Sequence, residues 1–461
     1  MTPGKTSGIE MMTTNRNGLA SVLRMWPFAA GLFLILLSVA ASVRHIFRGP
    51  AWPSDDADLS LFLQAARAIS RGQNPYDWAI YTHKMIYGYP PLFAELLAIL
   101  RLPLGDGRLW MIWAAFGVIC LAAAMALMMR RFGRTVSYRW IVLAVGALMI
   151  GHITRSDIYN VQPNFILLLL IVVGIYQFSK NRLVSGSLAW AAVIVCKPFT
   201  GAMVFYLMRR GQWREALATL LASSLLFVGS FVPLLPISLE VFKSWLQASH
   251  WHSAFPNVAK PTNETFYGLF YRLFADNEFT TPWMVHPGVI QWLMIPVLLL
   301  AIGGIYFGVS SPGRRAATPL AEVGAHDLLE VGLTLGLVMS CGPLMEGPHM
   351  FMLLPGLFGA AMLAQTRWRA NAPTKWWWLA AAASWSLIFA FFTIPISTPV
   401  VAPFSWGRLS GLEILVTAKF GFLTAFACIS SALALWQERA RPSRPRLGLA
   451  NPWGREPVGT A

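Results

Sequence analysis

Three carboxylates, Asp55, Asp56 and Asp58, lie in one short loop after the first long apolar run of the chain. Charged residues make up only 12% of the 461-residue sequence, so this concentration of carboxylates is unusual. A carboxylate held beside a substrate hydroxyl can accept its proton as a general base. A solvated acidic loop would have the same composition, and the motifs described below separate Asp58 from its two neighbours.

A second set of polar residues could bind an anionic group. Lys197, Arg155 and His349 could clamp a phosphate, because fixed cations can stabilise the charge of a phosphate leaving group without a metal ion. Lys197 could instead extend its amine to the membrane interface, and His349 could be an ordinary loop histidine. Further candidates for substrate binding are Gln162, Asn164, Asn263, Glu346 and Tyr89. Gln162 and Asn164 could also cap a helix beginning at Pro163.

The sequence lacks the motifs of nucleotide and metal sites. It contains no glycine-rich nucleotide fingerprint and no phosphate-binding loop. His250 and His252 are two residues apart and would not share a helix face. Asp56 and Asp58 have the spacing of a metal-binding Asp-x-Asp, but no further ligands accompany them. We therefore expect neither a metal ion nor another cofactor.

The composition predicts the class of fold that positions these residues. Hydrophobic residues make up 56% of the chain, above the roughly 45–50% of soluble domains. Apolar runs of about 20 residues recur, which predicts an all-α polytopic membrane protein. The net charge is +16, but the basic residues are scattered in short loops and the tail. They are typical of topology signals and contacts with anionic lipid, so we do not expect nucleic-acid binding.

Basic clusters mark cytoplasmic loops and place both termini in the cytoplasm. The predicted spans are 25–43, 108–129, 140–151, 164–178, 186–196, 198–208, 216–235, 289–308, 328–344, 349–365, 376–395 and 410–436. The segments on either side of Lys197 are too short to cross fully, and Pro198 breaks the helix between them. We interpret them as a short hairpin with Lys197 at its tip.

This topology divides the chain into five parts. They are a cytoplasmic N-terminal segment (1–24), a seven-span module (25–235) with a first external loop (44–107), a long external loop (236–288), a five-span region (289–436) and a basic tail (437–461) that we expect to be disordered. Amphipathic helices are expected at 59–70 and 91–102 in the first loop, and also in the long external loop 236–288. The candidate polar residues all fall on the external side, which favours a function at that face of the membrane.

The candidate residues occur in an ordered set of motifs. The set is Asp58-Leu59-Ser60-Leu61-Phe62, Gly72-x-Asn74-Pro75-Tyr76, Tyr89-Pro90-Pro91-Leu92, Gln162-x-Asn164, Lys197-Pro198, Asn263-x-Thr265 and Pro343 to His349. In this order it resembles glycosyltransferase family 87, the bacterial polyprenyl-phosphate-mannose-dependent mannosyltransferases of GT-C type. The resemblance extends from about residue 25 to residue 365.

The resemblance implies a GT-C glycosyltransferase fold in the bacterial inner membrane, with its active site facing the periplasm. It implies Asp58 as the catalytic base, Lys197 as the lysine of a Lys-Pro motif and His349 as the motif histidine; Asp55 and Asp56 are left as solvated neighbours. The implied reaction is inverting transfer of a sugar from a polyprenyl-phosphate donor to a glycolipid, glycan or protein acceptor. We expect the enzyme to act as a monomer among membrane lipids.

Three departures from the family pattern leave the donor sugar open between mannose, arabinose and other prenyl-linked sugars. Val161 replaces a glycine before Gln162, Gly342 replaces a serine before Pro343, and Met350 replaces a second histidine. Two other functions remain as alternatives. A flippase for lipid-linked sugars would show inverted repeats and polar groups through the membrane depth, and the sequence shows neither. A non-catalytic subunit would tolerate combined changes at Asp58, Lys197 and His349.

Overall fold

The computed structural model describes residues 25–41, 58–80, 87–132, 137–151, 157–158, 162–254, 257–312, 320–343, 347–393 and 408–439. Within these residues the regular structure is helical, with one isolated β-bridge between Thr280 and Leu409. The predicted all-α class is therefore confirmed. Asp55, Asp56, Arg155, Glu346, the N-terminal segment and the basic tail beyond residue 439 lie outside the described residues.

The first external loop contributes two helices to the structure. Helix α2 (Asp58–Ser70) begins at Asp58 and is followed by Gly72 in a left-handed conformation, φ 66°. A short 3₁₀ turn, η1 (Trp78–Ile80), precedes α3 (Pro91–Leu127), which begins with proline at its first position. Gly105, with φ 69°, kinks α3, so its amphipathic beginning and its apolar remainder run in different directions.

The central helices surround the break at Pro198. They are the helix at 25–41, α4 (Tyr138–Met149), α6 (Asn164–Ser179), α7 (Leu183–Cys196), η3 (Pro198–Gly201), α8 (Ala202–Arg209), α9 (Trp213–Gly229) and η4 (Val232–Leu234). Lys197 has an extended backbone, φ −136° and ψ 91°, between α7 and η3. Because Pro198 begins η3, the chain turns at the lysine.

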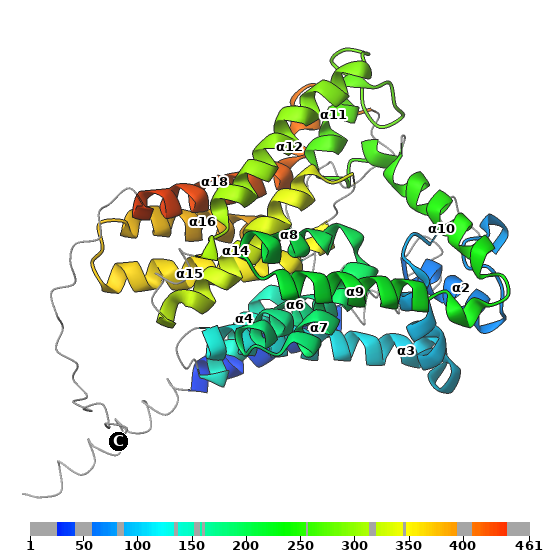
Figure 1. The fold of residues 1–461 in the computed structure, drawn as a ribbon, viewed down its shortest axis with the longest axis horizontal. Coiled ribbons are helices and arrows are strands. Elements are labelled where there is room, and N and C mark those ends of the chain that lie inside the picture. The colour runs from blue at the N-terminus through cyan, green and yellow to red at the C-terminus, as the bar shows by residue number, and fades with distance from the viewer. Residues whose placement is uncertain are drawn as a thin grey trace, which may run out of the picture.

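The second half of the chain forms a further group of helices. In order these are α10 (Ser238–Ser253), η5 (Asn257–Ala259), α11 (Phe266–Phe274), α12 (Gly288–Gly308), α14 (Leu320–Cys341), η6 (Gly347–Leu353), α15 (Leu354–Arg369), α16 (Lys375–Thr393), α17 (Leu412–Val416) and α18 (Lys419–Arg439). Helices α14, α15, α16 and α18 pack together, and α10 crosses from the α2 end of the molecule toward α11 (Figure 1).

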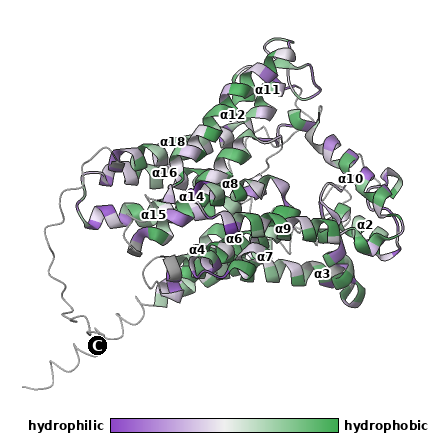
Figure 2. Cartoon of the chain, viewed as in Figure 1, coloured by the Kyte–Doolittle hydropathy of each residue, from purple (hydrophilic) through white to green (hydrophobic). Residues whose placement is uncertain are grey.

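Five helical segments are long and apolar enough to cross a membrane. They are Met111–Arg130, Trp213–Leu234, Gly288–Gly308, Glu322–Cys341 and Gly347–Arg369. Shorter apolar helices occur at Met25–Ala41, Tyr138–Met149, Asn164–Ser179 and Leu183–Cys196. Helix α12 is largely hydrophobic in Figure 2, whereas α10 mixes both kinds of residue. These helices support a multi-pass membrane protein, while the count of twelve spans stays a prediction.

A buried ion network joins the central helices to α14. The Arg210 Nη1 atom lies 2.5 Å from an Asp327 carboxylate oxygen, and its Nε lies 3.8 Å from Glu330. Glu330 also accepts hydrogen bonds from the backbone N–H and the hydroxyl of Ser310, at 3.0 and 2.5 Å. Ionisable groups within an apolar helix are costly, so these contacts fix how α14 lies against α8 and α12.

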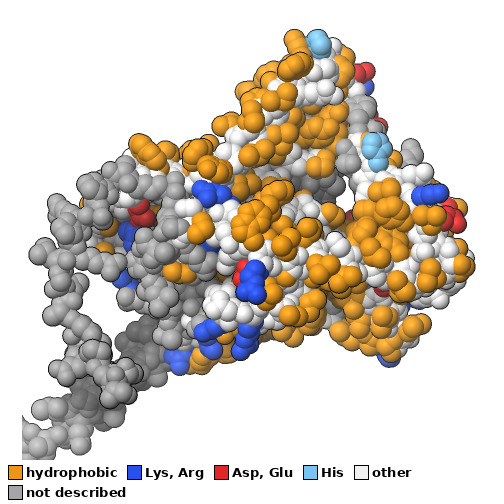
Figure 3. Space-filling model, viewed as in Figure 1, with side chains coloured by type: hydrophobic (Ala, Val, Ile, Leu, Met, Phe, Trp, Pro, Cys, Tyr) orange, Lys and Arg blue, Asp and Glu red, His pale blue; other side chains and the backbone are white. Residues whose placement is uncertain are grey.

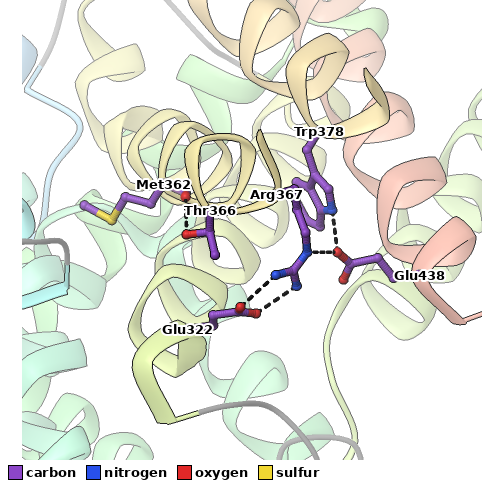
Figure 4. Close-up of polar contacts among 6 residues, drawn as sticks. All are labelled: Glu322, Met362, Thr366, Arg367, Trp378 and Glu438. Carbon is purple, nitrogen blue, oxygen red and sulfur yellow. Dashed lines mark hydrogen bonds and ion pairs between the residues drawn. The ribbon is translucent and has the colours of Figure 1, made fainter. Parts of the chain in front are cut away.

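A second network ties the last helices together at their ends (Figure 4). The Arg367 guanidinium donates two hydrogen bonds to Glu322, at 2.7 and 2.8 Å, and a third to Glu438. The Trp378 indole N–H donates to the same Glu438 oxygen at 2.7 Å. One arginine on α15 therefore links α14 to α18, and α16 joins through its tryptophan.

We expect Arg367→Met to lower the thermal unfolding midpoint of the protein in detergent. The change leaves Glu322 and Glu438 mostly buried without their cation, at a cost of about 3 kcal/mol, the lower end of the range for a broken buried pair. Arg369→Met is the matched control, because Arg369 is exposed at the end of the same helix. Equal unfolding midpoints for the two variants would contradict a stabilising role for the network.

Candidate active site

Asp58 lies in a hydrogen-bonded chain with two residues that are far away in the sequence. The side-chain amide of Gln162 donates to an Asp58 carboxylate oxygen at 2.5 Å. The Gln162 carbonyl oxygen accepts a hydrogen bond from the Tyr89 hydroxyl at 3.2 Å. Neither Gln162 nor Asn164 caps α6, so the capping alternative is wrong. Gln162 instead connects the first turn of α2 to the segment that precedes α3.

A second carboxylate, Asp157, lies next to the hydrogen bonds that join Asp58, Gln162 and Tyr89. It is 1% exposed, and its Oδ1 accepts a hydrogen bond from the fully buried Asn164 amide at 2.5 Å. Its backbone carbonyl accepts the backbone N–H of Gln162 at 3.0 Å. The two carboxylates, Asp157 and Asp58, lie within electrostatic reach of each other.

Lys197 and His349 complete the group. Lys197 is 3% exposed, and its amine lies 5.3 Å from the centre of the Tyr89 ring. His349 is buried at the beginning of η6, with its ring centre 5.8 Å from that of Phe199. Because Phe199 follows Lys197 by two residues, the turn at Pro198 also places the lysine near the histidine. Lys197 acts electrostatically on Asp58, on Asp157 and on His349.

Residues 87–326, more than half of the chain, match the family model of glycosyltransferase family 87. The chain belongs to this family. The predicted resemblance is thus confirmed, and the protein is a membrane glycosyltransferase. A comparison with curated proteins gave no match. The matched range includes Tyr89, Gln162 and Lys197, whereas Asp58 and His349 lie outside it.

Burial sets the acidity of both carboxylates in this family 87 enzyme. Burial raises the pKa of Asp58 above its usual 3.8, and the Gln162 hydrogen bond together with the charges of Lys197 and Lys260 opposes the rise. Burial raises the pKa of Asp157 well above 3.8, with a further contribution from the negative charge of Asp58. Asp157 therefore holds a proton more readily, and Asp58 is the better candidate for an ionised base.

The motifs of the first loop form the support for Tyr89. The side chain of Asn74 accepts the backbone N–H of Tyr76 at 3.0 Å and donates to Ser244 of α10 at 2.9 Å. The Tyr76 hydroxyl donates to the Tyr89 carbonyl at 2.6 Å. Tyr87 connects the same segment to the beginning of α3, where its hydroxyl donates to the Pro90 carbonyl at 3.0 Å.

Asn263 uses its side chain for structure. It is fully buried, and its amide donates to the carbonyls of Val258 and Pro343, both at 2.8 Å. It thereby joins the turn before α11 to the segment before η6. Sequence reasoning missed Lys260, which acts on Asp58, because no motif includes it. Within the described part of the chain, no group of three or more His, Cys, Asp and Glu side chains could hold a metal ion.

We expect Gln162→Leu to move the acid limb of the pH–rate profile of the enzyme to higher pH. If Asp58 is the base it must be ionised, and the rate would then fall as the pH drops through its raised pKa. The amide hydrogen bond favours the charged carboxylate by about 1.5–3 kcal/mol, which corresponds to a shift of about one to two pH units.

Gln64→Leu is the matched control, because the Gln64 amide donates to Ser60 of its own helix instead of to a carboxylate. Its pH–rate profile should coincide with that of the wild type. An acid limb that stays in place in Gln162→Leu would show that Asp58 is not the group that titrates.

Proposed function

We propose that this enzyme transfers a sugar, mannose in the first instance, from a polyprenyl-phosphate donor to an acceptor hydroxyl with inversion at the anomeric carbon. Asp58 accepts the hydroxyl proton while the acceptor oxygen forms a bond to the anomeric carbon. The bond from that carbon to the phosphate oxygen breaks, and its electron pair leaves with the prenyl phosphate. The observation that carries this proposal is the part-buried Asp58–Gln162 hydrogen bond beside Lys197.

The two carboxylates support a single displacement. Retaining glycoside hydrolases use two carboxylates at the sugar, one that attacks the anomeric carbon and one that exchanges a proton. Here Asp157 is 1% exposed and accepts a hydrogen bond from Asn164, so of the two carboxylates only the partly exposed Asp58 could reach a substrate. That leaves Asp58 as the base and the acceptor oxygen as the nucleophile.

The cations near Asp58 support a charged leaving group. Lys197 offers a positive charge where a phosphate would depart, and the neighbouring His349 offers a ring nitrogen for a hydrogen bond. Fixed groups of this kind stabilise developing charge with little reorganisation. Arg155 and Glu346 remain proposed substrate ligands on the strength of their sequence positions alone. Because fixed cations can stabilise the phosphate, we also propose that the reaction needs no metal ion.

The distribution of charge supports a periplasmic site in a bacterial inner membrane. On the face shown in Figure 3, most of the Lys and Arg side chains lie toward the end of the molecule away from α2 and α10. Basic ends face the cytoplasm in membrane proteins. Asp58, at the beginning of α2, would then face the opposite compartment, where the acceptor hydroxyl is presented.

We expect Asp58→Asn to lower the turnover number by about 10²–10⁴-fold, the usual contribution of a general base. Donor binding should change little, because the amide keeps the size of the carboxylate. The measurement is the release of prenyl phosphate from synthetic prenyl-phosphate mannose by purified enzyme with membrane extract as the acceptor source. Asp77→Asn is the control, since Asp77 is an exposed carboxylate in the same loop. Near-normal turnover by Asp58→Asn would exclude the assignment.

Transfer should also continue in the presence of EDTA, because the proposed site stabilises the phosphate with Lys197 and His349 and not with a metal ion. The same release assay is run with and without chelator, and then with added Mg²⁺ or Mn²⁺. Unchanged rates are the expected result. A loss of turnover that either metal restores would show that a metal ion, and not Lys197 and His349 alone, stabilises the leaving group.

A further inference from the structure

The turn between α10 and α11, residues 257–263, is held by three buried polar side chains. The Asn257 amide donates to the Trp251 carbonyl and the Asn263 amide donates to Val258 and Pro343, each at 2.8 Å. The Arg272 guanidinium donates to the carbonyl of Lys260, also at 2.8 Å. All three polar side chains are less than a tenth exposed. Burying such groups costs free energy unless they are hydrogen-bonded, so the conformation of this turn is strongly specified.

The turn presents one ionisable side chain, Lys260, beside the site. Its amine lies 5.9 Å from the centre of the Trp251 ring, within the range of a cation–π interaction. Trp251 in turn contacts Trp78 of the first loop edge to face, with ring centres 5.1 Å apart. Lys260 is thereby connected through Trp251 to the first external loop.

Two lysines from separate segments act on the same carboxylate. Lys197 comes from the break between α7 and η3, and Lys260 comes from the turn before α11. Both charges favour the ionised form of Asp58. Asp157 interacts electrostatically both with Asp58 and with Lys197, and His349 interacts with Lys197.

In the proposed reaction the phosphate gains a negative charge while Asp58 loses one by accepting the proton. The sugar donor is a phosphate diester with one negative charge, and the departing prenyl phosphate is a monoester that gains another when the bond to the sugar breaks. One lysine matches the charge that is present in the bound donor. The second balances Asp58 at the start and the charge that appears on the phosphate as the bond breaks. An interaction with the phosphate that is made mainly in the transition state raises turnover more than affinity.

We propose that Lys260 is a catalytic phosphate ligand of this enzyme, which stabilises the charge that develops on the departing prenyl phosphate. The inference rests on the proposed transfer from a prenyl-phosphate sugar and adds a residue to it. Trp251 and Arg272 are positioning residues, because one holds the amine and the other holds the backbone of Lys260.

The test compares Lys260→Gln, Lys260→Arg and the wild type as full-length enzymes in lipid nanodiscs with synthetic prenyl-phosphate mannose. Lys260→Gln should lower kcat by about 10²-fold, the scale for removing one group that stabilises transition-state charge, and change KM by less. Lys260→Arg keeps the positive charge and should recover part of kcat. Lys243→Gln is the matched control, because Lys243 is exposed on α10; its kcat and KM should equal those of the wild type.

Binding of prenyl phosphate at pH 8, where a phosphate monoester is a dianion, gives a readout that does not need turnover. Lys260→Gln should bind prenyl phosphate more weakly than the wild type and Lys243→Gln do. If the wild type binds prenyl phosphate but transfers no sugar, the proposed function fails and the role of Lys260 as a phosphate ligand is still decided by the variants. If Lys260→Gln equals Lys243→Gln in kcat, KM and prenyl-phosphate affinity, the proposal is overturned.

Discussion

A carboxylate can remain ionised in a partly buried position only when other groups replace the water that it has lost. At Asp58 those groups are the Gln162 amide at 2.5 Å and the charges of two lysines. They come from the beginning of α6, the end of α7 and the turn before α11. The rest of the structure depends on this requirement, because a small displacement of any of these segments would leave a buried charge without compensation.

The segments around Asp58 must be held in precise positions, and this requirement explains the polar contacts elsewhere in the protein. Helices in a membrane gain little from hydrophobic contact with one another, since lipid is as apolar as they are. The Arg210 and Arg367 networks therefore hold the helices together, as a hydrophobic core does in a soluble enzyme. They fix α14 and α15 against their neighbours, and through η6 they fix the position of His349 relative to Lys197.

The sequence predicted much of the fold for identifiable reasons. Long apolar runs indicated the membrane helices. Pro198 indicated the helix break at which Lys197 lies. The sequence could not show that Gln162 would bridge Asp58 and Tyr89 or that Asn263 would join two backbone segments, because such pairings depend on how distant helices pack. Asp327 and Glu330 lie in an apolar run, where two carboxylates are expensive without a partner, but the sequence does not show that Arg210 is that partner.

The positions of the charges also suggest why one set of fixed cations is enough for the proposed reaction. Before transfer the site would hold an ionised Asp58 and a donor phosphate with one negative charge. Afterwards Asp58 carries the proton and the phosphate monoester carries two charges, so the total is unchanged. The lysines that compensate Asp58 at the start can compensate the phosphate at the end if both lie within their reach. A negative charge then moves over a short distance between groups that the protein already surrounds with cations, and little reorganisation is required.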